Sequence, residues 1–113
     1  MDNYVPDECL ANLQRISVKD SVVLHEKDRA YRGSWKKRGG VGAFMMLCRK
    51  WDRLEAFVGA EDYDIFKAIR NDPRDESVLD DIRDLRRYLA LVEAEISVQQ
   101  NDNVGVDVTY TSP

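Results

Sequence analysis

The spacing of apolar residues near the end of the chain is the feature that most constrains its fold. Aliphatic side chains recur there at intervals of three or four, at Val78, Ile82, Leu85, Leu89, Val92 and Ile96. Such intervals place the side chains on one face of an α-helix, whereas a half-buried strand requires alternation. The pattern therefore predicts one long helix from Asp75 to about Val98, whose apolar face other elements must cover.

The N-terminal region predicts helix as well. Asp7 follows Pro6 and is suited to cap a helix, because its side chain can accept a hydrogen bond from a free backbone N–H group. A second helical run covers residues 18–29. The sequence leaves open whether this region is one bent helix or two.

Two helices are predicted in the middle of the chain. The first opens at Val41 or Gly42 after a glycine-containing loop and runs to Val58, with Gly59 as its C-cap. The second is short and covers residues 61–71, up to the break at Asp72-Pro73. Its inward side chains are expected to be Ile65, Phe66 and Ile69.

These elements predict an all-α fold, a small bundle of four to five helices in a single domain over residues 1–98. Residues 99–113 form a C-terminal tail of different character. Valines alternate there with small or polar residues, which is typical of a strand, at Val104, Val106 and Val108. The tail is therefore flexible, or is an arm that adds to another protomer.

Composition excludes several classes of protein. The chain has 113 residues and a net charge of -4, which fits one globular domain and argues against general nucleic-acid binding. It has neither an apolar run long enough for a membrane span nor a leader pattern, so a cytoplasmic location is expected. Cys9 and Cys48 are expected to be free thiols. A single histidine, His25, excludes a multi-histidine metal site, and no nucleophile–base pair marks catalytic residues.

Charge is divided unevenly along the chain. Residues 27–53 contain nine cations and two acids, whereas residues 54–84 contain ten acids and four cations. The two segments can pair in space and neutralise one another. Alternatively, the basic segment offers a local site for an anion. Both interpretations remain open at this point.

The loop before the predicted middle helix has the composition of a nucleotide site. Gly39-Gly40 precedes a helix start, whose free N–H groups and dipole attract anions. Cations precede the glycines, and aromatic rings offer surfaces on which a base can stack. The predicted ligand-binding residues are Tyr31, Arg32, Ser34, Trp35, Lys36, Arg38, Gly39, Gly40, Lys50 and Trp51. The alternative makes Trp35 a core residue and the basic run a solvated loop.

Pairs of carboxylates offer a second hypothesis, a metal site. Asp52 and Glu55 stand three residues apart on one predicted helix, and Asp81 and Asp84 do so on another. Acids on two packed helices can hold Mg²⁺ against a pyrophosphate. Helical geometry predicts that Glu55 points inward and that Asp84 faces away from the core, with Asp81 at its border. A structural ion pair is the alternative for Glu55.

Three stretches resemble a known family. DRAYRGSW at 28–35 looks like the aspartate-tyrosine-x-glycine-x-tryptophan signature of the first nucleotide-modification-associated domain family, which is common in bacteriophages. RKWDRLE at 49–55 is similar to that family's basic helix. ESVLDDIRDLRRYLAL at 76–91 looks like its closing helix. The resemblance covers about residues 27–91 and implies an all-α phage protein linked to nucleotides. The helical layout also looks distantly like that of MazG-type nucleotide pyrophosphohydrolases.

The leading expectation is a phage-type protein that binds a nucleotide, or a molecule derived from one, and sequesters a signal of host antiviral defence. The first alternative is a Mg²⁺-dependent nucleotide pyrophosphohydrolase that uses Asp52, Glu55, Asp81 and Asp84, or an accessory protein of nucleotide modification. The second is a structural or inhibitory interaction protein. A homo-oligomer is expected, because so short a chain forms few deep pockets alone. No membrane partner is expected.

Overall fold

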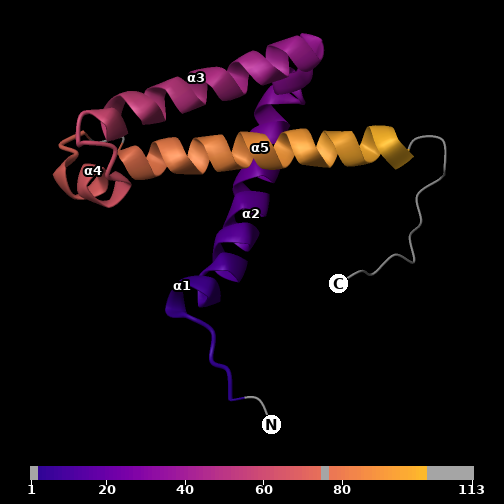
Figure 1. The fold of residues 1–113 in the computed structure, drawn as a ribbon. Helices are drawn as coiled ribbons and strands as arrows, with labels where there is room; N and C mark the ends of the chain where they lie inside the picture. The colour runs from indigo at the N-terminus through magenta and orange to yellow at the C-terminus, as the bar shows by residue number, and fades with distance from the viewer. Residues whose placement is uncertain (1–2, 75–76, 102–113) are drawn as a thin grey trace. The chain divides into compact units, whose positions relative to one another are not determined.

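The computed structural model describes residues 3–74 and 77–101, and the regular elements among them are all helices (Figure 1). The predicted all-α fold is confirmed. The chain divides into two compact units, Met1–Lys37 and Arg38–Pro113, and each is described by itself. The single domain over residues 1–98 stays a prediction. The strand-like pattern that begins at Val104 lies outside the described residues.

The first unit contains α1 (Glu8–Ala11) and α2 (Leu13–Tyr31). The predicted cap is confirmed, because a carboxylate oxygen of Asp7 accepts a hydrogen bond of 2.8 Å from the backbone N–H of Cys9. Asn12 separates the two helices, so this region is two helices rather than one bent helix.

The second unit contains α3 (Gly39–Gly59), α4 (Ile65–Asn71) and α5 (Val78–Asn101). The helices α3 and α5 run beside one another, with α4 at one end of the pair (Figure 1). The core lies near that end. It consists of Leu54, Ala68 and Val78, with partly buried side chains packed against them, namely Val58, Ile65, Ile82 and Leu85.

Gly59 does not cap α3 as predicted. The helix ends with Gly59, and its C-cap is Ala60, which has right-handed helical geometry. The left-handed residues come later, at Asp62 and Tyr63. The glycine makes room for a ring instead, since a Cβ atom on Gly59 would lie 3.3 Å from the side chain of Tyr63.

The helix α4 is shorter than predicted because Asp64 begins it. One carboxylate oxygen of Asp64 accepts hydrogen bonds of 3.1 Å from the backbone N–H groups of Phe66 and Lys67. The predicted inward face is confirmed only at Ile65, since Phe66 is 73% exposed and Ile69 is 37% exposed. The small side chain of Ala68 is buried in their place.

By its apolar spacing, the sequence of α3 predicts a core face of Phe44, Leu47, Cys48, Trp51 and Val58, and the structure differs from this prediction. Phe44 and Trp51 are 63% and 51% exposed, whereas Ala43 and Leu54 are buried. The true core face is turned by about 60° from the predicted one, at 100° per residue. Glu55 is therefore exposed, and its predicted inward direction is wrong. The apolar residues of α3 form two neighbouring faces. The direction that helical periodicity predicts lies between these two faces.

The helix α5 begins at a capping box. Asp80 accepts a hydrogen bond from the backbone N–H of Ser77 at 2.9 Å, and the Ser77 hydroxyl accepts one from Leu79 at 3.2 Å. The predicted apolar stripe is confirmed in its first half, where Val78 is buried and its neighbours line the core. Leu89, further along, is 50% exposed. The predicted start at Asp75 lies outside the described residues.

Candidate functional site

The loop after α2 folds back on the end of that helix. Arg32 and Gly33 both have left-handed backbone conformations, with φ of 47° and 72°. Their backbone N–H groups donate to the carbonyl oxygen of Asp28 at 2.7 Å and to its carboxylate at 3.0 Å. The first acid of the DRAYRGSW stretch therefore fixes the loop, a role that the sequence analysis did not assign. The geometry leaves the side chain of Tyr31 66% exposed.

The loop continues as a short 3₁₀ turn, η1 (Ser34–Lys36). The backbone N–H groups of Lys36 and Lys37 donate to carbonyl oxygens three residues earlier, at Gly33 and Ser34, both at 3.1 Å. Trp35 is half-buried, and the serine and both lysines are exposed. Backbone N–H groups of the loop thus find their hydrogen-bond acceptors within the loop, and its polar side chains remain at the surface.

The helix α3 starts without a side-chain cap in the described part of the chain. Arg38 precedes it with φ of -98°, and Gly39 has a left-handed φ of 74°. A Cβ atom on Gly39 or Gly40 would meet no heavy atom within 4 Å, so the backbone there faces open space. The first N–H groups of a helix have no intrahelical acceptor, and here no side chain supplies one. Such a terminus can accept an anion.

Gly42 has a steric role beside this terminus. A Cβ atom on Gly42 would lie 2.7 Å from the Cβ atom of Arg38 and clash with it. The missing side chain thus lets Arg38 lie against the first turn of α3. The Cβ and Cγ atoms of Arg38 consequently lie beside the helix start that offers the free N–H groups.

Lys50 and Trp51 do not join this terminus. They follow Gly40 by ten or more residues in one helix, which at 1.5 Å per residue places them about 15 Å away along its axis. The ammonium group of Lys50 lies 3.3 Å from a carboxylate oxygen of Asp84 and 5.6 Å from the ring centroid of Tyr88. Lys50 therefore links α3 to α5.

The four predicted metal-binding acids are not gathered into one cluster. Asp52 and Glu55 are exposed on α3, whereas Asp81 is buried and paired with arginines. Asp84 was expected to face away from the core, but its carboxylate reaches across to α3. In residues 3–74 and 77–101, no group of three or more acids, cysteines or histidines could hold a metal ion. Cationic side chains pair with two of the four acids, Asp81 and Asp84.

The buried acid belongs to an ion-pair network that the sequence analysis missed. Asp81 is 2.9 Å from Arg53 of α3 and 3.1 Å from Arg74, and its side chain is 3% exposed. Arg74 also lies 2.7 Å from Asp72, and its guanidinium carbon is 3.3 Å from the ring centroid of Phe57. Arg74 is thus held by two carboxylates and a ring, and it ties the turn before α5 to α3.

The network changes the ionisation of its members. Hydrogen bonds from the Arg74 side chain, together with smaller effects of the backbone N–H groups of Arg74 and Val78, lower the pKa of Asp72 from 3.8 to about 2. The same pairing raises the pKa of Arg74. Both groups therefore stay charged throughout the neutral range.

We expect the stability of the second unit to fall between about pH 4 and pH 2. The folded-state pKa of Asp72 lies below its unfolded value of 3.8, so its contribution is present above pH 4 and is lost as the pH falls through about 2. Urea unfolding at a series of pH values measures this loss. In the Asp72→Asn variant, the free energy of unfolding should depend less on pH below pH 4. If its pH dependence is unchanged, other acids cause the loss of stability.

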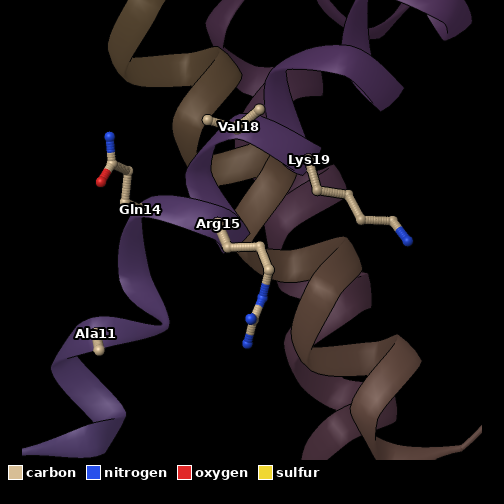
Figure 2. Close-up of a pocket in the computed structure, with 5 residues that line it drawn as sticks. All are labelled: Ala11, Gln14, Arg15, Val18 and Lys19. Carbon is tan, nitrogen blue, oxygen red and sulfur yellow. The ribbon is translucent and has the colours of Figure 1, made fainter.

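A separate open hollow lies on the first unit, lined by Ala11, Gln14, Arg15, Val18 and Lys19. Figure 2 shows Gln14 and Lys19 pointing away from one another, so the polar groups do not converge on one point. None of the predicted ligand-binding residues line it. We assign no site to this hollow.

Comparison of the chain with protein families, with curated proteins and with solved structures finds no match. In the described part of the chain, every helix is too short or too polar to cross a membrane.

Proposed function

We propose that this chain binds a phosphorylated nucleotide, with its phosphate at the start of α3. The observation that carries this proposal is the start of α3, where two open glycines follow Arg38 and no N-cap side chain binds the first N–H groups. A phosphate gains hydrogen bonds from such N–H groups and favourable interaction with the helix dipole. The exposed lysines immediately before Arg38 add positive charge.

The base of the nucleotide stacks on an aromatic side chain of the loop. The proposed stacking residues are Trp35 and Tyr31, whose ring is exposed. Trp51 lies too far along α3 to share this ligand's phosphate site.

We further propose that the protein holds its ligand without cleaving it. Asp81 and Asp84 are each bound to cationic side chains, which leaves them poorly placed to hold Mg²⁺ against a pyrophosphate. The resemblance to the bacteriophage family supports a nucleotide ligand. In a phage, such a binder would sequester a nucleotide signal of host antiviral defence.

A nucleotide panel tests this function. The protein is incubated with mononucleotides, cyclic dinucleotides and ADP-ribose derivatives, with and without Mg²⁺, and the bound ligand is released by heat and analysed. Tight binding and release of an intact ligand support the proposal. Metal-dependent formation of a monophosphate and pyrophosphate would instead identify a hydrolase. Failure to bind every member of the panel would overturn the proposal.

The double variant Arg32→Ala with Trp35→Ala should weaken binding by about 100-fold. Loss of one stacked base and one charged hydrogen bond costs about 3 kcal/mol together. Calorimetric titration with the ligand from the panel measures the change. Arg70→Ala is the matched control, because Arg70 is an exposed arginine on α4 outside the loop. This variant should bind the ligand as tightly as the wild type. If the double variant binds as tightly as the wild type, the loop is not part of the binding site.

A further inference from the structure

The helix α3 carries a second apolar face that the core does not use. We call it the outer face and define it as Val41, Phe44, Cys48 and Trp51. Three of these side chains are 79%, 63% and 51% exposed, in the order Val41, Phe44 and Trp51, and Cys48 is half-buried. Phe44 and Trp51 are seven residues apart, which places them on one line along the helix. Aromatic rings exposed in one line are typical of an interaction surface.

Opposite charges mark the two ends of the outer face. Arg38 precedes its first residue, and Glu55 follows Trp51 by one helical turn on the same line. Both are exposed, and within the described residues neither side chain has an ion-pair partner. Read from the N-terminus, the surface is therefore cationic, then apolar, then anionic. A surface with this order is complementary to a copy of itself turned end to end.

From this order we infer that the outer face binds a second copy of the chain, with the two α3 helices antiparallel about a two-fold axis. Placing Phe44 of one copy against Trp51 of the other brings Glu55 level with Gly40 and next to Arg38 of the other copy. The carboxylate then faces both a guanidinium group and the uncapped start of a helix. The antiparallel helix dipoles also oppose one another favourably.

A second copy fits this surface better than an unrelated protein does, because a two-fold interface must be self-complementary. The contact is short, however. The aromatic pair and its aliphatic neighbours cover less than the roughly 800 Å² that each partner contributes to a standard interface. The dimer should therefore be reversible, with a Kd on the order of 10 µM.

This inference goes beyond the proposed function and does not depend on it. The two meet at Arg38, since a nucleotide phosphate and Glu55 of the other copy would compete for one guanidinium group. The test of the dimer uses protein without nucleotide. Its failure is therefore distinct from a failure to bind nucleotides.

Sedimentation equilibrium across protein concentrations tests the dimer. The wild-type chain should pass from monomer to dimer, and Phe44→Ser should raise the dimer Kd at least about 10-fold. Phe66→Ser is the matched control, because Phe66 is 73% exposed on α4 and lies off the outer face. A wild-type chain that stays monomeric at several hundred micromolar would overturn the inference. So would equal effects of the two variants.

Charge reversal tests the proposed orientation. Glu55→Arg and Arg38→Glu should each weaken the dimer, and the double variant should restore most of the lost affinity. Additive losses in the double variant would exclude the antiparallel pairing. Because both side chains are exposed, these variants should fold even where an apolar substitution does not.

Cross-linking of Cys48 gives an independent readout. The two-fold axis passes beside Cys48, so the two thiols should lie close together across the dimer. In a Cys9→Ser background, where Cys48 is the sole cysteine of the chain, oxidation by diamide should yield a covalent dimer. Adding Phe44→Ser should reduce the yield several-fold. An undiminished yield would show that cross-linking follows collision rather than this interface.

Discussion

Asp81→Asn is expected to lower the free energy of unfolding by about 3 kcal/mol. The substitution keeps the size of the side chain and removes its charge. The carboxylate of Asp81 is 3% exposed and contacts arginines on both sides, at 2.9 Å and 3.1 Å. Without it, Arg53 and Arg74 face one another across a site with too little negative charge. Among the acids that the structure describes, Arg74 then keeps only Asp72 as a partner.

Asp84→Asn is the matched control for this prediction. It lies one turn further along α5 and also pairs with a cation of α3, but its side chain is 38% exposed. Exposed ion pairs contribute about 0.2–1 kcal/mol. Urea unfolding of the wild type and both variants measures the difference. Similar losses in the two variants would contradict the view that the buried network, rather than paired charge in general, joins α5 to α3.

Leu54→Ala should also cost about 3 kcal/mol, because Leu54 fills the small core between α3, α4 and α5. Its side chain is 7% exposed, and few other buried residues can move to close the cavity. At the enthalpy of a chain of this length, the midpoint of thermal unfolding should fall by about 15 °C.

Leu89→Ala provides the comparison for the core prediction. It removes the same atoms from α5 at a position that is 50% exposed, so the expected loss is below about 1 kcal/mol. Circular dichroism during heating measures both midpoints. A larger loss at Leu89 than at Leu54 would place the main packing contact in the second half of α5 instead.

The helices could be predicted from the sequence because their signals are local. The apolar spacing of α5 and the capping role of Asp7 depend on residues within one or two turns. The face of α3 that points to the core could not be predicted in the same way. Its apolar residues cover two neighbouring faces, and only the position of α5 decides which of them is the core. Glu55 was misplaced for this reason.

Some features of the candidate site could likewise be predicted from the sequence, and others could not. The glycines and cations at Arg38–Gly40 are visible in the sequence, and the structure gives them an uncapped helix start. The network of Arg74 was not visible, because it joins a turn to residues seven positions later and to another helix. Asp28 offered a local signal. An acid a few residues before a glycine at a helix end can bind the N–H groups of the turn.

The most direct test of nucleotide binding at this place is an NMR titration of ¹⁵N-labelled protein with the nucleotide that the panel identifies. We expect the largest changes in backbone amide shifts at Lys36–Gly42, with saturation at one ligand per chain. Shifts centred on the hollow of Ala11–Lys19, or the absence of any shift, would contradict the assignment of the start of α3 as the phosphate site.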